Sequence, residues 1–248
     1  MSRALSLPFA ILCYAIFFAS FLYLIAFVGD LPVPKTVDSP PSTLAPVAAA
    51  VVDVALIALF GFQHSIMARR GFKRTWTRVV PPPFERSVYV LCASTALLIL
   101  FWFWEPIDGT LWAVPTTMQW ARYILIGLFL TGFGIVLVST FLINHFELFG
   151  LQQAWLHAIG LEAEAPELCQ PLFYRWVAHP LYAGFFLAFW ATPQMSYGHL
   201  LLAIGLSIYM LVAIRYEEHD LTRVFGEDYR RYRSSVGMLL PRFRRRSA

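Results

Sequence analysis

Long apolar runs constrain this chain more than any other feature. Four of them, residues 8–28, 44–67, 88–104 and 123–143, approach or exceed the length of a transmembrane helix, which needs about 20 mostly apolar residues. Only 14% of the residues are charged, whereas soluble domains carry about 25%. The chain therefore has too few charged residues to cover the surface of a soluble globule. The sequence predicts an all-α, polytopic transmembrane helical bundle and excludes a soluble enzyme, a disordered chain and a disulfide scaffold.

Two shorter runs follow, residues 180–190 and 199–214, separated by a break at Pro193. They form either two crossings or a hairpin that reaches only the middle of the bilayer. We therefore expect five to six membrane segments and a C-terminal helical region. The first run of 21 residues is longer than the apolar part of a secretory signal, about 7–15 residues, so it is expected to be a retained span.

The three cysteines, Cys13, Cys92 and Cys169, form no even disulfide framework, so free thiols are expected.

Basic residues predict the orientation. With a cytoplasmic N-terminus, all but Lys35 and Arg122 of the 19 Lys and Arg residues fall inside, as the positive-inside rule requires. Both termini and any active site should then face the cytoplasm, and the bacterial inner membrane is the expected location. The net charge of +4 is then a feature of topology and indicates no nucleic-acid partner. The tail Arg242–Arg246 fits the same explanation, although contact with anionic headgroups is an alternative.

The most specific stretch is residues 174–184, Tyr-Arg-Trp-Val-Ala-His-Pro-Leu-Tyr-Ala-Gly. A residue before proline avoids the helical region and proline suits the first helical position, so a helix should begin at Pro180. Its free N–H groups would attract a carboxylate or a phosphate, with His179 and Tyr182 beside them. An interfacial helix start with an aromatic anchor is the equally weighted alternative.

A second polar stretch, residues 215–232, follows the last apolar run. Its paired acids, Glu217 and Glu218, are costly near lipid and suggest partners such as an ammonium group or arginines. Tyr229 and Tyr232 are three residues apart, share a helix face and could pack on a flat ring. A solvated amphipathic tail explains the same residues. Consecutive helical residues diverge by about 100°, so a metal site at 217–220 is disfavoured and no metal is expected.

Together, these two stretches resemble the isoprenylcysteine carboxyl methyltransferase superfamily of membrane enzymes. Residues 62–69, Phe-Gln-His-Ser-Ile-Met-Ala-Arg, resemble its nurim/NnrU-like branch. Residues 144–153, Asn-His-Phe-Glu-Leu-Phe-Gly-Leu-Gln-Gln, are similar to the bacterial methanethiol S-methyltransferases within that branch. The resemblance covers most of residues 55–240. One departure is Ala178, where the superfamily often has arginine; Arg175, one turn earlier, is a possible substitute.

The resemblance implies S-adenosyl-L-methionine as cofactor, bound between the two stretches. The implied cofactor-binding residues are Tyr174, Arg175, His179, Pro180 and Tyr182 on one side, and Arg215, Glu217 and Glu218 on the other, with a glutamate on the ammonium or ribose. Tyr229 and Tyr232 would cover the adenine.

Two histidines are candidates for catalysis. His64 ends the second span, and His145 follows Asn144 at the exit of the fourth. A lone histidine beside an apolar helix is more often structural, but two histidines at the same membrane depth make a functional role about as probable as a structural one. Asp53 lies about 16 Å from His64 along a helix, so it cannot be a direct partner and is assigned to packing or a polar relay. The glycines of the fourth span, Gly127, Gly132 and Gly134, predict close helix packing.

The implied reaction is S-adenosylmethionine-dependent S-methylation of methanethiol to dimethyl sulfide, with His64 or His145 as base and Asn144 as its orienting group. One integral-membrane methyltransferase domain covers residues 1–248, with four spans in 1–143, a connector in 144–178, a hairpin in 179–214 and a cofactor-covering tail in 215–248. The expected partners are the thiol and the lipid bilayer; the oligomeric state stays open. Two alternatives are a lipid-borne acceptor (a prenylcysteine carboxylate or a phospholipid amine) and a non-enzymatic NnrU-like membrane protein.

Overall fold

The computed structural model describes residues 3–161 and 171–242. Cys169 and Arg244–Arg246, which entered the thiol and orientation predictions, lie outside these residues. Cys13 and Cys92 are free thiols, as predicted.

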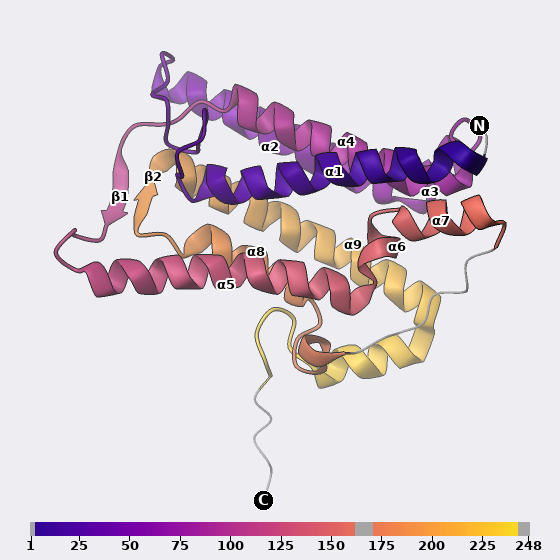
Figure 1. Ribbon diagram of the computed structural model, residues 1–248. Coiled ribbons are helices and arrows are strands. Elements are labelled where there is room, and N and C mark those ends of the chain that lie inside the picture. Colours follow the sequence, from indigo (N-terminus) through magenta and orange to yellow (C-terminus); the bar gives the residue numbers. More distant parts are fainter. Residues whose placement is uncertain (1–2, 162–170, 243–248) are drawn as a thin grey trace, which may run out of the picture.

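The chain folds into an all-α polytopic bundle (Figure 1). Each apolar run lies in a helix to within a few residues: the second long helix begins two residues after its run, whereas the other long helices begin two to six residues before theirs. Within the described residues, five helices are long and apolar enough to cross a membrane: α1 (Arg3–Val28), α2 (Pro46–Ala68), α4 (Pro82–Phe103), α5 (Gln119–Ile143) and α9 (Tyr197–Ser235). α8 (Pro180–Trp190) has 11 residues and is too short to span alone. Of the last two runs, therefore, one crosses within a long helix and the other does not.

The smaller elements lie at the two ends of the bundle (Figure 1). The end that carries the N-terminus, called here the N-terminal end, holds α3 (Arg70–Trp76), α6 (His145–Leu148) and α7 (Leu151–Ile159). The opposite end, called here the sheet end, holds β1 (Thr110–Ala113) and β2 (Gln194–Ser196), an antiparallel pair in which Trp112 faces Met195. A 3₁₀ turn (Leu172–Arg175) precedes α8.

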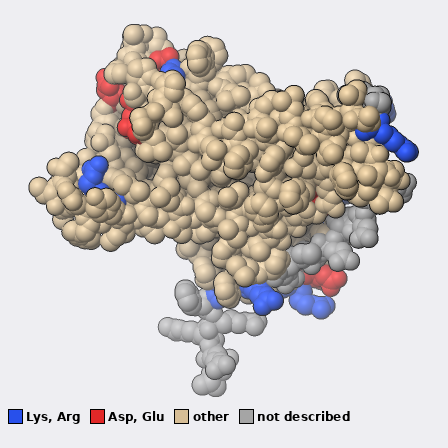
Figure 2. All heavy atoms as spheres, in the orientation of Figure 1, with Lys and Arg blue, Asp and Glu red and all other residues tan. Residues whose placement is uncertain are grey.

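The middle of the bundle has an uncharged surface. On the face drawn in Figure 2, the Lys, Arg, Asp and Glu side chains gather toward the ends and edges, and the broad central part is free of them. Large apolar side chains in the middle of α1, α5 and α9, such as Phe18, Leu130 and Ile208, are exposed. An apolar belt between charged ends is what a bilayer-embedded bundle requires.

The helices form two closely packed groups. α1 packs on α4 and α7, α2 packs on α4 and α9, and α5 packs along α8. Aromatic rings join α1 to α5, with the Phe21 and Phe133 ring centroids 5.8 Å apart. Asp53 on α2 is fully buried and accepts a hydrogen bond from the Glu105 backbone N–H at 2.9 Å. It ties α2 to the end of α4 and is not a partner of His64, as predicted.

The contact of α5 with α8 depends on two glycines. A Cβ at Gly132 would lie 2.6 Å from the Gly184 carbonyl oxygen, and a Cβ at Gly184 would lie 2.6 Å from the Gly132 carbonyl oxygen. The prediction of close packing is thus confirmed for Gly132. It is wrong for Gly127 and Gly134, where a Cβ would meet nothing within 4 Å, because those positions face away from α8.

Gly132→Ala is expected to destabilise the bundle by about 1–3 kcal/mol, since the new methyl group must push two backbones apart. The measurement is the thermal unfolding midpoint in detergent micelles. Gly134→Ala is the matched control, because it adds the same methyl group in open space and improves helix propensity. Equal midpoints for the two variants would contradict the packing argument.

Candidate active site

A cavity of about 550 Å³ lies between the two helix groups. Toward the N-terminal end, charged side chains line it: Arg69, Arg86, Glu217 and Asp220. The Arg69 and Asp220 side chains are about one-third exposed, with Nη1 and Oδ2 3.8 Å apart, so this part of the cavity reaches the protein surface. Deeper in the bundle the lining is apolar: Phe17, Phe21, Leu97, Val136, Phe185 and Phe189.

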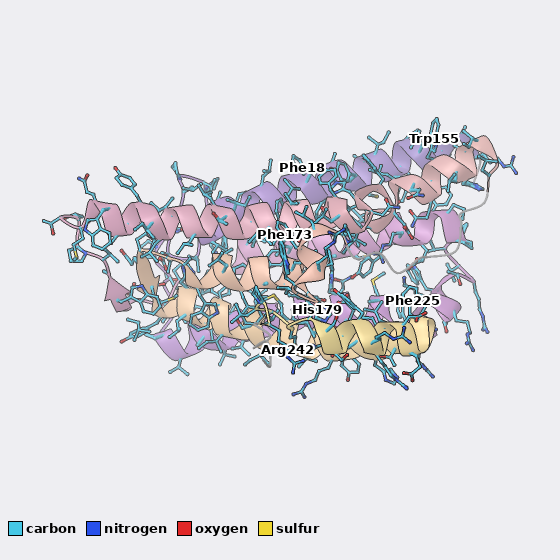
Figure 3. The ribbon with its side chains drawn as sticks, turned by 90° about the horizontal axis from the view of Figure 1, so that it is seen from below. Phe18, Trp155, Phe173, His179, Phe225 and Arg242 are labelled. Carbon is cyan, nitrogen blue, oxygen red and sulfur yellow. The ribbon has the colours of Figure 1, made fainter. Side chains whose placement is uncertain are left out.

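The two polar stretches meet at the charged part of the cavity. Tyr182 on α8 donates a hydrogen bond to Glu217 Oε2 at 2.9 Å. His179 Nε2 lies 3.2 Å from Glu218 Oε1, and Arg233 also binds that oxygen. Side-chain contacts therefore join the two stretches, although the residues in contact are 35 and 39 positions apart in the sequence. Figure 3 shows His179 beside the C-terminal part of α9 (yellow).

The start of α8 follows from its sequence. His179 has a non-helical backbone (φ −128°, ψ 65°) and Pro180 is the first helical residue, as predicted. The chain that follows α9 fixes this turn in place. The Ala178 N–H donates to the Gly237 carbonyl at 2.8 Å, and the His179 N–H donates to the Met238 carbonyl at 3.1 Å. His179 is thus buried, and hydrogen bonds fix both its backbone, through Met238, and its ring, through Glu218.

Tyr229 and Tyr232 lie behind this turn. Both are buried in a cluster with Ala178 and Val236, and the Tyr232 hydroxyl donates to the Tyr174 carbonyl at 2.8 Å. Within the described chain, the cavity lining includes Tyr174 and Ala178 but neither of these tyrosines. Their predicted contact with the adenine stays a prediction. In the structure, they contact Ala178 and Tyr174, which form part of the cavity lining. Burial, and then the charge of Glu217, raises the pKa of the Tyr174 phenol, so its hydroxyl is a donor.

Five other predicted site residues are not part of the cavity lining: Asn144, Arg175, Pro180, Arg215 and Glu218. Arg175 and Arg215 are exposed. Asn144 caps α6 by accepting from the Glu147 N–H at 3.2 Å and donates to Gln152 Oε1 at 2.6 Å. Its side chain therefore serves the local turn and does not bind the His145 ring.

Both candidate histidines line the cavity, and each is paired with a tyrosine. His64 Nε2 lies 2.8 Å from the Tyr89 hydroxyl. His145 Nε2 lies 2.8 Å from the Tyr14 hydroxyl, and its Nδ1 lies 2.8 Å from Thr140 Oγ1. Burial lowers the pKa of His145, which favours a neutral ring. The pairs differ in two respects: Tyr89 lines the cavity and Tyr14 does not, and His64 Nδ1, unlike His145 Nδ1, has no hydrogen-bond partner among the described residues.

Sequence reasoning missed several residues around the cavity. Arg86 and Tyr89 share a face of α4, with the guanidinium carbon 5.3 Å from the ring centroid. Their i, i+3 spacing at the start of an apolar run was the available signal. Arg69 packs 4.0 Å from the Tyr216 ring centroid. Arg233 gave no signal because it lies in an arginine-rich tail.

Known proteins resemble this chain over nearly its whole length. It is 49% identical to the methanethiol S-methyltransferase of Mycobacterium tuberculosis over 242 residues, covering 97% of this chain and 98% of the relative. It is 49% identical to that of Pseudomonas deceptionensis, covering 88% of this chain and 82% of the relative. Nurim of Bos taurus is 32% identical over 69% of this chain and 67% of its own length. No family model and no solved structure matches. The chain therefore belongs to the family of the methanethiol S-methyltransferases, with nurim as a more distant relative.

Proposed function

We propose that this integral-membrane methyltransferase transfers a methyl group from S-adenosyl-L-methionine to methanethiol and releases dimethyl sulfide. The observation that carries the proposal is the junction of the 174–182 and 217–220 segments around one end of a cavity that also holds His64. The names of the relatives supply the acceptor.

The charged end of the cavity fits a cationic cofactor. Glu218 is balanced by Arg233 and His179, whereas Glu217 binds the neutral Tyr182 hydroxyl. Glu217 therefore keeps a negative charge suited to an ammonium group. Tyr182 and Tyr209 also line the cavity, and ring faces attract a cation by about 0.5–2 kcal/mol. The cavity volume of about 550 Å³ lies in the usual range of cofactor sites.

When bound, S-adenosylmethionine supplies an electrophilic methyl group on a sulfonium. The protein has to supply the thiolate, because an alkyl thiol is mostly protonated near neutral pH and the thiolate is the nucleophile. We assign His64 as the final proton acceptor. His145 is less suited because both of its ring nitrogens already have partners in Tyr14 and Thr140.

The apolar depth of the cavity suits the rest of the reaction. A thiolate and a sulfonium lose their charges as the methyl group moves, and a low-dielectric site favours charge neutralisation. Phe17, Phe185 and Phe189 exclude water there. We further propose that the N-terminal end faces the cytoplasm, because most of the described basic residues lie on or next to α3, at the start of α4 and on the C-terminal half of α9.

The test is to incubate the purified protein with methanethiol and S-adenosylmethionine and to measure dimethyl sulfide by gas chromatography. The expected result is product that needs both reactants and the protein. A methyl label recovered in the lipid fraction instead of dimethyl sulfide would contradict the acceptor. Absence of product while the cofactor still binds would remove the thiol as substrate.

A further inference from the structure

We infer that Tyr89 is a catalytic residue: its hydroxyl accepts the thiol proton and passes its own proton to His64. This inference rests on the proposed function and names the group through which the base acts.

Neither nitrogen of His64 is open to the cavity. Nε2 is occupied by the Tyr89 hydroxyl at 2.8 Å. Nδ1 is buried and has no hydrogen-bond partner among the described residues. The ring is fixed by Phe60, with centroids 5.4 Å apart, and by Tyr209, with centroids 6.2 Å apart. His64 itself lines the cavity, but its Nε2 is occupied by the Tyr89 hydroxyl, so a thiol proton reaches that nitrogen through the Tyr89 oxygen, which also belongs to a lining residue.

The second tyrosine–histidine pair gives an internal contrast. Tyr14 and His145 have the same Nε2-to-hydroxyl distance of 2.8 Å, yet Tyr14 is not among the cavity-lining residues. His145 also has a partner on Nδ1, the Thr140 hydroxyl. In that pair both ring nitrogens are occupied and the tyrosine lies outside the lining, whereas Tyr89 belongs to the lining and His64 Nδ1 has no partner among the described residues.

The charges near Tyr89 favour this role. The Arg86 guanidinium carbon lies 5.3 Å from the ring centroid, where its positive charge stabilises negative charge on the tyrosine oxygen or on a thiolate. The same charge disfavours a proton retained on His64 and so promotes its release. The other titratable groups of the lining are Arg69 between α2 and α3, His145 on α6, Tyr174 and His179 before α8, Tyr182 on α8, and Tyr209, Glu217 and Asp220 on α9.

The step balances. The thiol S–H bond breaks and its proton goes to the Tyr89 oxygen, while the Tyr89 O–H proton goes to His64 Nε2. The thiol sulfur forms a bond to the methyl carbon, and the bond from that carbon to the sulfonium sulfur breaks, its electron pair staying on the leaving sulfur. The products are two neutral thioethers and an imidazolium, which releases its proton to water.

The test is Tyr89→Phe, which removes only the hydroxyl, with kcat/KM for methanethiol measured from about pH 6.5 to 9.5. Wild type should be nearly flat above the titration of its base. The variant must take up thiolate preformed in solution, so its loss should be about 100- to 10,000-fold at the acidic end. The loss should then shrink about tenfold per pH unit, as the thiolate fraction rises.

Tyr14→Phe is the matched control, because it deletes a tyrosine hydroxyl that is paired with a histidine but belongs to a residue outside the cavity lining. Any loss it causes should be the same at every pH. A Tyr89→Phe variant with wild-type rates, or with a loss that does not depend on pH, would overturn the relay. Failure of the proposed function is distinguishable, since wild type itself would then form no dimethyl sulfide. Retained binding of S-adenosylhomocysteine shows that each variant is folded.

Discussion

His64→Gln is expected to lower kcat for methanethiol by about 100- to 10,000-fold, the usual contribution of a general base, with cofactor affinity unchanged. Glutamine can still accept a hydrogen bond from the Tyr89 hydroxyl, although it loses the ring contacts with Phe60 and Tyr209. It cannot take up a proton. The measurements are the initial rate of dimethyl sulfide formation and the affinity for S-adenosylhomocysteine.

His219→Gln is the control for this variant, because His219 lies exposed on α9 and should leave the rate unchanged. Since Tyr89 and His64 act as one unit, the double variant should be no slower than the slower single variant. Full turnover by His64→Gln would exclude this histidine as the proton acceptor, and multiplicative losses in the double variant would separate it from Tyr89.

Glu217→Gln is expected to weaken binding of S-adenosylmethionine and of its product S-adenosylhomocysteine by about 10- to 100-fold. The reason is that a hydrogen bond to a charged group is worth about 1.5–3 kcal/mol, and both ligands carry the ammonium group. Glu217 lines the cavity and, among the described residues, forms no ion pair with a Lys or Arg, unlike Glu218. Calorimetric titration with S-adenosylhomocysteine measures the effect.

Glu227→Gln serves as the matched change. Glu227 lies on the same helix but its side chain is 75% exposed and pairs with Arg230, so its removal should leave cofactor affinity unchanged. Equal affinities for Glu217→Gln and wild type would show that the ammonium group is held elsewhere.

The parts of this fold that could be predicted from sequence are those set by composition over many residues. The spans followed from the length of the apolar runs. The start of α8 followed from His179-Pro180, because proline restricts its own backbone angles and those of the residue before it. The β1–β2 pair has strands of four and three residues, too short for an alternating pattern to show. Which glycine of α5 packs on α8 depends on the rotation of the helix, and that is set by tertiary contacts.

The candidate site was predictable only in part, for a similar reason. The two polar stretches stand out because acids and histidines are costly at a membrane edge, so His179, Glu217 and Glu218 were noticed. Tyr89 and Arg233 were missed because a tyrosine beside an apolar run and an arginine in a basic tail are ordinary there. The roles of these two residues come from a partner, His64 for the first and Glu218 for the second, and such pairing requires coordinates.

The most direct test of the account is a calorimetric titration of the wild-type protein in detergent or lipid nanodiscs with S-adenosylhomocysteine. The account predicts saturable binding at one site per chain. A titration without saturable heat would contradict it, because the junction of His179 with the acids of α9 would then enclose no site for a methyl donor.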